Sequence, residues 1–336
     1  MKRSIKILSL LSLLALSVVL LEDFIDLDKA KDPQNQISPS LEIYQAYQKE
    51  PITPIPESLN LNSQKVQLGE QLFHDPNLSH DKTLSCATCH NLKKGGADGL
   101  PHPNSASLQK ASLPNHTVFN SPTIFNATFN FVQGWEGKAK NLKQQIAIPL
   151  FNHFEMGNKN WDGILTYLNH TPHYKQSFQK IYNAPISSEM VVDVISEFER
   201  SLITPNSPFD LYLKGQSNAL SRNEQEGYRL FKKRGCIACH QGINIGGNLY
   251  QKTGIFKPMH PSQEHKPKQF KVPSLRNIAL TAPYFHDGAI ETLEEAINLM
   301  AEHQLGLDLP LDENQKIQAF LKTLTGQYKG QSLSYE

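Results

Sequence analysis

The sequence has almost no net charge and few residues of the kinds that mark special classes of protein. Its 33 lysines and arginines stand against 32 aspartates and glutamates, so the formal net charge is +1. Domains that bind nucleic acid usually carry a basic excess, so we expect no nucleic-acid partner. The 19 glycines and 21 prolines are spread along the chain and 39% of the residues are hydrophobic, which excludes collagen-like, disordered and multi-span membrane proteins. With 336 residues the chain is long enough for two globular domains.

Long hydrophobic runs are also rare, and the one strong run lies at the start of the chain. Residues 7–21 are apolar or small and follow Lys2, Arg3 and Lys6. Basic residues before about 15 apolar ones are typical of a secretory signal, whereas a membrane span needs about 20. We therefore expect residues 1–30 to direct export. Because no small-residue cleavage site follows the run, an uncleaved N-terminal anchor is the alternative.

Cysteine is scarce, and its placement is informative. An exported protein with four cysteines would usually form two disulfides. Here each cysteine pair is followed at once by a histidine, in SCATCHN and in GCIACHQ. This CxxCH pattern is typical of covalent haem c, because the two thiols bond to the porphyrin and the histidine binds the iron. The predicted attachment residues of the two haem c groups are Cys86, Cys89 and His90, and Cys236, Cys239 and His240.

Two other interpretations of the cysteine pairs are a redox disulfide in each pair and one four-cysteine zinc site. Neither needs the histidine that follows each pair. The separation between Cys89 and Cys236 is also far longer than the usual gap between the halves of a zinc site. The pattern therefore favours two haem groups.

The surroundings of the two motifs indicate an internal repeat. A G-x-x-L-F element precedes each motif, beginning at Gly69 and at Gly227. Residues 190–202 and 313–326 place apolar side chains at helical spacing after each motif. Alternating strands are scarce. We therefore predict a mainly α fold of two cytochrome c-like helical domains.

The segment between the two copies predicts the domain boundary. Residues 203–218 are rich in Pro, Asn and Ser, as linkers often are. The predicted domains are residues 40–205, with the first haem, and residues 206–336, with the second.

The sixth iron ligand decides whether a haem carries electrons or reacts with a substrate. In the second half, Met300 lies on an amphipathic helix that begins near Thr292. A thioether opposite His240 would fill the coordination sphere and raise the reduction potential. Helical periodicity alone favours the other interpretation, in which Met300 is a packed core residue.

From about residue 50 to 328, the sequence resembles the bacterial diheme cytochrome c peroxidases. PSLRNIALTAPYFHDG, followed by LEEAINLM and QLG, is similar to the C-terminal signature of that family. NSPTIFNATFNFVQGWEGKAKNLKQQIAIPLFNHFEMG resembles the family segment that runs from an N-x-P-T stretch to E-M. The resemblance implies that Met300 is the distal ligand of the haem that accepts electrons.

The same resemblance implies a reactive iron in the first half. Glu155 matches the family's general acid and base, and Gln145 matches an amide that orients peroxide. Trp135 matches the tryptophan between the two haems, where it would couple them electronically. Pro149 and Met156 also match the motif and would shape the pocket.

The family also binds calcium between its domains. By resemblance, the ligands would be the side-chain amide of Asn120 and the backbone carbonyls of Thr281 and Pro283. Oxygen ligands of this kind suit a hard cation.

The sequence departs from the family at two places. Lys138 stands where the family has an arginine, and a lysine cannot form a bidentate pair with a carboxylate. The histidine that many relatives use as a removable ligand of the first haem aligns with Ser112. His102 and His116 lie nearby and are alternative ligands, and an iron that is already open is the third possibility.

These observations predict a periplasmic cytochrome-c peroxidase that reduces hydrogen peroxide to water. The expected electron donor is a small cytochrome c or a cupredoxin, and relatives are often homodimers. One alternative is a protein-modifying diheme oxidase of the methylamine dehydrogenase maturation type, in which a tyrosine replaces the methionine ligand. The other alternative is a non-enzymatic diheme electron carrier, in which both irons are six-coordinate.

Overall fold

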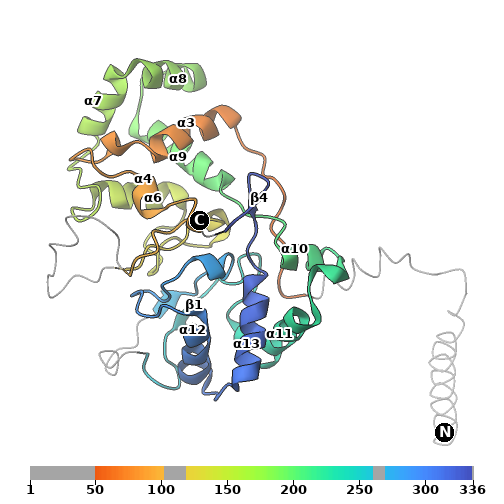
Figure 1. The fold of residues 1–336 in the computed structure, drawn as a ribbon. Helices are drawn as coiled ribbons and strands as arrows, with labels where there is room; N and C mark the ends of the chain where they lie inside the picture. Colours follow the sequence, from red (N-terminus) through yellow and green to blue (C-terminus); the bar gives the residue numbers. More distant parts are fainter. Residues whose placement is uncertain (1–49, 102–118, 260–268, 335–336) are drawn as a thin grey trace, which may run out of the picture. The chain divides into compact units, whose positions relative to one another are not determined.

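The computed structural model describes residues 50–101, 119–259 and 269–334 (Figure 1). The predicted signal or anchor at residues 1–30, and the alternative ligands His102 and His116, lie outside the described residues. None of the helices within these ranges is long and apolar enough to cross a membrane. Below, the first half means residues 50–205 and the second half means residues 206–334.

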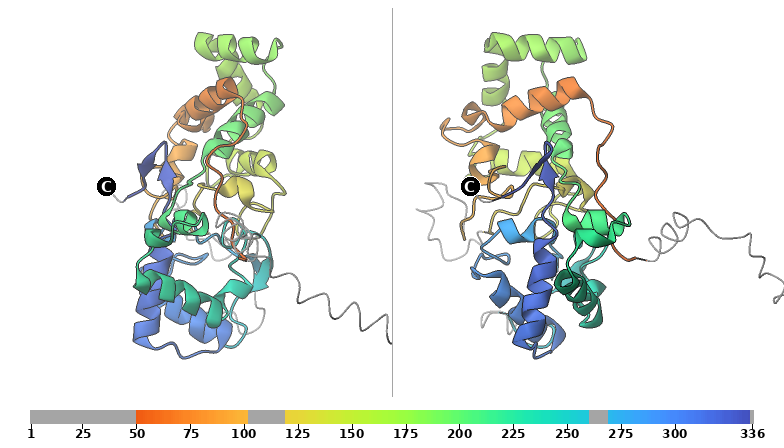
Figure 2. Two further views of the ribbon diagram at one scale, coloured as in Figure 1. Left: turned by 90° about the vertical axis from the view of Figure 1, so that its right-hand side faces the viewer. Right: turned by 45° about the vertical axis from the view of Figure 1, so that its right-hand side comes forward.

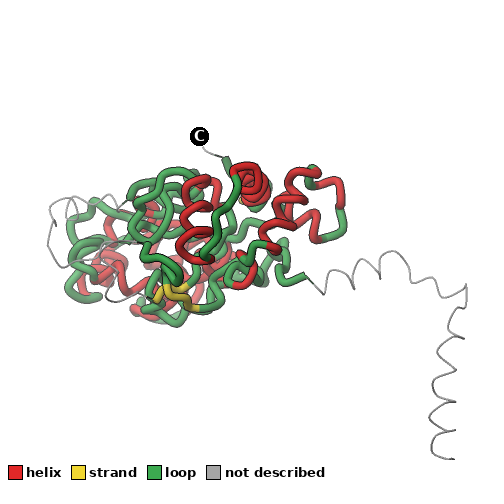
Figure 3. The backbone as a smooth tube through the Cα atoms, turned by 90° about the horizontal axis from the view of Figure 1, so that it is seen from below, coloured by secondary structure: helices red, strands yellow, loops and turns green. Residues whose placement is uncertain are grey.

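Helices and loops make up nearly all of the described chain, and the strands are short (Figure 3). The predicted mainly helical class is therefore confirmed. The α-helices are α3 (Ser63–Phe73), α4 (Cys86–Cys89), α6 (Leu142–Phe151), α7 (Asp162–His170), α8 (Pro172–Tyr182), α9 (Ser188–Ser201), α10 (Pro208–Leu213), α11 (Arg222–Lys233), α12 (Leu293–Leu299) and α13 (Leu311–Lys322). A π-helical turn, η8 (Met300–Gln304), follows α12 directly. The strands form two antiparallel pairs, β1 (Tyr250–Lys252) with β2 (Gln269–Lys271) and β3 (Gln327–Tyr328) with β4 (Gln331–Ser332).

The repeated G-x-x-L-F element has a structural reason in each half. Helix α3 packs against α9, and a Cβ atom at Gly69 would overlap the backbone carbonyl of Val194 in α9. Helix α11 packs against α13, and a Cβ atom at Gly227 would overlap the carbonyl of Lys316 in α13. Only glycine permits this close approach of two helix backbones. The repeat therefore specifies the same helix crossing twice.

The predicted linker at residues 203–218 contains a short helix that its composition did not indicate. Ser207 accepts a hydrogen bond from the backbone N–H of Asp210, and the Asp210 carboxylate accepts one from the N–H of Ser207. With Pro208 in the first turn, this capping box starts α10. Phe209 is fully buried, so the segment is part of the core and not a free tether. The predicted domain boundary stays a prediction.

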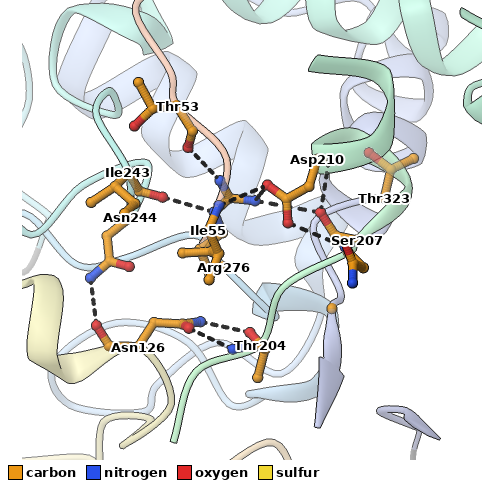
Figure 4. Close-up of polar contacts among 12 residues, drawn as sticks. Thr53, Ile55, Asn126, Thr204, Ser207, Asp210, Ile243, Asn244, Arg276 and Thr323 are labelled. Atoms are coloured by element: carbon orange, nitrogen blue, oxygen red, sulfur yellow. Dashed lines mark hydrogen bonds and ion pairs between the residues drawn. The ribbon is translucent and has the colours of Figure 1, made fainter. Parts of the chain in front are cut away.

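A buried ion pair joins distant parts of the chain (Figure 4). The Arg276 guanidinium, 1% exposed, lies 2.7 Å from the Asp210 carboxylate of α10. It also donates to the carbonyls of Thr53 and Ile243, each at 2.9 Å. Ile243 follows the second CxxCH motif, so this cluster holds the start of the described chain, α10 and the second haem segment together.

The C-terminal segment returns to the first half (Figure 2). Tyr328 packs against Phe125, with ring centroids 5.1 Å apart. Tyr328 and Leu333 both pack on the core cluster that contains Phe73 and Phe198 and borders Cys86. The last residues of the second half therefore help to cover the first haem segment.

Candidate functional site

The two CxxCH segments adopt closely similar conformations. In each, a single helical turn begins at the first cysteine, and the backbone N–H of the histidine donates to the carbonyl of that cysteine. These hydrogen bonds measure 2.9 Å at His90 and 3.0 Å at His240. All four thiols are free and half-buried. Among the described residues, no three His, Cys, Asp or Glu side chains gather in a metal-binding group, so the four-cysteine zinc site does not form there.

The histidine rings are oriented as iron ligands require. His90 Nδ1 lies 3.3 Å from the carbonyl of Gly96, and His240 Nδ1 lies 3.2 Å from the carbonyl of Ile245. When Nδ1–H donates to a carbonyl, Nε2 keeps its lone pair for a metal. Burial lowers the pKa of both rings, to about 4 for His240, so the neutral form that binds iron is favoured. The two motifs fit covalent haem c.

The second half contains a cavity beside its CxxCH motif. Cys236, Cys239 and His240 lie in its wall, and Met300 lies in the same wall at the end of α12. Thr292 caps α12 by accepting from the backbone N–H of Glu295, so the helix begins where the sequence predicts. The fold therefore brings the predicted distal ligand, Met300, to the cavity of the second haem.

Loops of similar conformation precede α6 in the first half and α12 in the second. Asn126 and Asn277 both adopt the left-handed backbone conformation, with φ of 62° and 60°. Each loop then closes with an isolated antiparallel bridge, Gln133–Ala139 in the first and Tyr284–Ile290 in the second. The two halves therefore share the loop conformation that leads to α6 in one half and to α12 in the other.

When the two loops are superimposed residue by residue, Pro149 of α6 and Met300 at the end of α12 occupy equivalent positions. The same superposition aligns Leu142 and Leu293, the first residues of α6 and α12. A proline side chain has no atom that can bind iron, whereas the methionine thioether can. The structural repeat thus places a side chain that can bind iron, Met300, beside the cavity of the second half and a proline at the equivalent place in the first half.

Glu155 lies just beyond α6. Its carboxylate accepts a hydrogen bond of 2.8 Å from the Asn152 side chain. Burial raises the pKa of Glu155 above its ordinary range, and the hydrogen bond from Asn152 acts in the opposite direction. Burial, with further contributions from the charges of Asp98 and Glu155, raises the pKa of the Cys89 thiol to about 12. The Glu155 charge thus acts on Cys89, one of the predicted attachment residues of the first haem, and the catalytic role of Glu155 stays a prediction.

Gln145 and Trp135 lie together near the boundary between the halves. The Gln145 side-chain oxygen faces Gly134, next to Trp135. The Trp135 indole donates a 2.8 Å hydrogen bond to the carbonyl of Asn120. Trp135 also lies in the wall of the second haem cavity, so it connects a first-half loop to that cavity.

The three residues predicted to bind calcium lie near this boundary. Asn120 is 6% exposed, and its Nδ2 atom lies 2.6 Å from the Pro283 carbonyl. Asn120, Thr281 and Pro283 all line the same cavity.

Two residues near the site were not singled out from the sequence. Asn152 holds the Glu155 carboxylate, and its spacing of three residues before Glu155 in FNHFE is the signal that could have indicated it. Lys271 lies buried in the wall of the cavity beside the second CxxCH motif. No pattern in the neighbouring sequence distinguishes it from a lysine on the surface of a strand.

Comparisons with known proteins agree with these features. The family model for di-haem cytochrome c peroxidase matches residues 63–218. Cytochrome c peroxidase Ccp of Escherichia coli (strain K12) is 43% identical over 296 residues, which are 84% of this chain. The chain spans only 62% of the length of that relative. Cytochrome c551 peroxidase of Nitrosomonas europaea is 40% identical over 82% of this chain and 84% of its own length.

A solved structure shares the fold. It is a MauG-like protein associated with microbial copper homeostasis, with a TM-score of 0.69 and 27% identity. The match covers 82% of this chain and 93% of that protein. Two similar CxxCH segments, one methionine-lined cavity and these relatives lead to one conclusion: the chain belongs to the di-haem cytochrome c peroxidase family.

Proposed function

We propose that this protein reduces hydrogen peroxide to water at the haem of its first half, with electrons that enter through the haem of its second half. The observation that carries the proposal is the difference between Pro149 and Met300 at equivalent places of the repeat. Met300 would complete the coordination of the second iron, whereas Pro149 offers no ligand to the first iron and Glu155 is the acid and base that we assign to it. An iron without a sixth protein ligand can bind a substrate.

When bound, the first haem supplies the iron at which the O–O bond is broken, and the second haem supplies a stored electron. Cys86, Cys89 and His90 would hold the first group, and Cys236, Cys239, His240 and Met300 the second. The residues of the chain handle the substrate and its protons. Overall, one peroxide, two protons and two electrons give two water molecules.

Glu155 would move the proton in this reaction. Its carboxylate takes a proton from one peroxide oxygen and returns it to the other oxygen, which leaves as water. The partly buried position raises the pKa of Glu155 and so makes the group able to hold a proton between the two steps. The Gln145 amide would orient the peroxide by a hydrogen bond.

Trp135 would couple the two haems electronically, so that an electron can pass from the second haem to the first. Its indole lies in the wall of the cavity beside the second CxxCH motif and donates a hydrogen bond to the carbonyl of Asn120.

The proposed donor is a small cytochrome c or a cupredoxin. The proposed location is the periplasm, because covalent haem c and an N-terminal basic and apolar segment both suit an exported protein. A homodimer is the proposed assembly, by similarity to the family.

We also propose one calcium ion at Asn120, Thr281 and Pro283. The Asn120 amide lies against the Pro283 carbonyl, and turning the amide end for end would direct Oδ1 to the same place. Two or more oxygens that face one point suit a hard cation. Removal of calcium with a chelator should lower peroxidase activity, and added calcium should restore it. In the Asn120→Ala variant, activity should respond to neither treatment.

The protein-modifying oxidase is the weaker alternative. That type of enzyme has a tyrosine as the axial ligand of the second haem, whereas Met300, which lines the cavity here, is the ligand that we propose. The MauG-like solved structure is also less similar in sequence, at 27% identity, than the two peroxidases at 43% and 40%.

The test is the optical and EPR spectrum of the purified holoprotein, oxidised and half reduced, before and after peroxide is added. We expect one low-spin haem with methionine ligation and one haem that reacts with peroxide, together with oxidation of a reduced small cytochrome. Two low-spin haems that stay inert to peroxide in both states would instead identify an electron carrier. The Met300→Leu variant should lose the methionine-ligation band, and Met190→Leu, in the helical core, should keep it.

A further inference from the structure

Lys271 is a buried cation in strand β2. It is 7% exposed and pairs with Tyr250 of β1 in the antiparallel register. Its backbone N–H donates a 2.9 Å hydrogen bond to the carbonyl of Trp135. The residue therefore lies at the boundary where the first half meets the second haem cavity.

The amino group of Lys271 has no counter-ion within residues 50–101, 119–259 and 269–334. No carboxylate of those ranges forms an ion pair with it, no hydrogen bond from its side chain is present there, and burial is the only influence on its pKa. Burial alone lowers the pKa of Lys271, to about 8, which is the result expected for an ammonium group without an anion. A buried charge is normally paired, because desolvation without compensation is costly.

Two other cationic side chains near the cavity, Arg234 and Lys252, are either paired with an acid or exposed to water. Arg234 forms a two-pronged hydrogen bond with the Glu313 carboxylate, so its charge is already matched. Lys252 lies on an exposed part of β1, where water solvates its charge. Lys271 is thus the cavity-lining lysine that is buried without an acid partner in the described part of the chain.

The residues of the cavity wall indicate which anion could pair with Lys271. Its wall contains Lys271 together with Cys236, Cys239, His240 and Met300. The Thr253 hydroxyl is another buried polar group of this wall that lacks a hydrogen-bond partner in the described residues. A haem c bound to these residues brings two propionate carboxylates into the cavity. Their negative charge would compensate a cation that the described residues leave without a counter-ion.

We propose that the Lys271 ammonium group forms an ion pair with a propionate of the second haem and thereby raises the reduction potential of that haem. The pairing rests on the proposed assignment of a haem to this cavity. A fixed positive charge near the iron favours the reduced state, because reduction lowers the positive charge of the iron by one. Lys271 would act as a positioning and tuning residue and would not touch the peroxide.

The test is the midpoint potential of the methionine-ligated haem, measured by spectroelectrochemistry in the holoprotein. Lys271→Met should lower it and shift the reduction equilibrium about tenfold, which is about 59 mV for one electron. Lys271→Arg keeps the charge and should stay near the wild type. Lys322→Met, at an exposed position of α13 that does not line the cavity, is the control and should change the potential little. An unchanged potential in Lys271→Met, or a shift in the other haem alone, would overturn the proposal.

If the Lys271→Met variant does not fold or does not incorporate haem, a second measurement tests the proposal. Resonance Raman spectra of the wild type and Lys271→Arg then report the propionate bending mode directly. A shifted band supports the contact, and identical bands contradict it. Peroxide turnover is measured in parallel. A protein that shows the potential shift but no turnover would refute the proposed peroxidase function and leave the role of Lys271 standing.

Discussion

Trp135 and His286 occupy equivalent places in the two loops of the repeat, and their rings meet edge to face with centroids 6.3 Å apart. Phe270 packs against both rings, at 6.4 Å from Trp135 and 4.4 Å from His286. The backbone N–H of Asn120 donates to the carbonyl of His286, while the Trp135 indole donates to the carbonyl of Asn120. The boundary between the halves is therefore a packed aromatic cluster, held by hydrogen bonds to one asparagine.

Replacing Trp135 tests whether this cluster carries electrons. Trp135→Phe keeps an aromatic ring but removes the indole N–H that donates to Asn120. We expect electron transfer from the second haem to the first to slow about tenfold or more, an effect on the activation barrier of about 1.4 kcal/mol. Flash reduction followed at the absorption bands of each haem measures this rate. Trp161→Phe, which packs on Phe151, is the control and should leave the rate unchanged.

Removing the carboxyl group of Glu155 tests its role as proton carrier. Glu155→Gln keeps the size and can still contact Asn152, but it cannot take up a proton. Because a well-placed acid and base contributes about 10²–10⁴-fold, we expect kcat/KM for peroxide to fall by that factor. Steady-state oxidation of a reduced small cytochrome measures it. Activity within a few-fold of the wild type would show that another group moves the proton.

Asn152 gives a prediction about pH dependence. The hydrogen bond from Asn152 stabilises the ionised form of Glu155, so it lowers a pKa that burial raises. Asn152→Ala removes this hydrogen bond, and the pKa of Glu155 should rise further. Because the ionised form accepts the proton, the acidic limb of the pH profile of kcat/KM should move to higher pH. If the acidic limb is the same in the wild type and in Asn152→Ala, that limb does not report the ionisation of Glu155.

The ion pair of Arg276 and Asp210 gives a prediction about stability. Arg276→Met leaves the Asp210 carboxylate buried without its partner, and the loss of one member of such a pair costs about 3–5 kcal/mol. Adding Asp210→Leu should recover part of the loss. The midpoint of denaturant unfolding measures both. Arg229→Met, which removes an exposed ion pair with Glu226, is the matched control and should change the midpoint little.

A large part of the fold was accessible from local sequence. The helices predicted at residues 190–202 and 313–326 correspond to α9 (Ser188–Ser201) and α13 (Leu311–Lys322). Apolar spacing predicts such helices, because one face must pack on the core. The linker prediction missed α10, since its short helix depends on the capping box of Ser207 and Asp210 and on the burial of Phe209.

The sequence by itself determined the chemistry that depends on near neighbours along the chain. Two CxxCH motifs specify two covalent haems, because the thiols and the imidazole act within five consecutive residues. Gly69 and Gly227 mark the repeated helix crossing, because a missing side chain is visible in the sequence. The family resemblance then indicated Met300 and Glu155 as candidates.

Only the tertiary structure decided which distant groups meet. It brings Met300 to the cavity of Cys236 and places Trp135 against His286, which are contacts between separate loops and helices. It also buries Lys271 without an acid partner in the described chain, although a lysine in a strand is usually exposed. Burial and long-range pairing depend on how the whole chain packs, so short-range sequence patterns do not contain them.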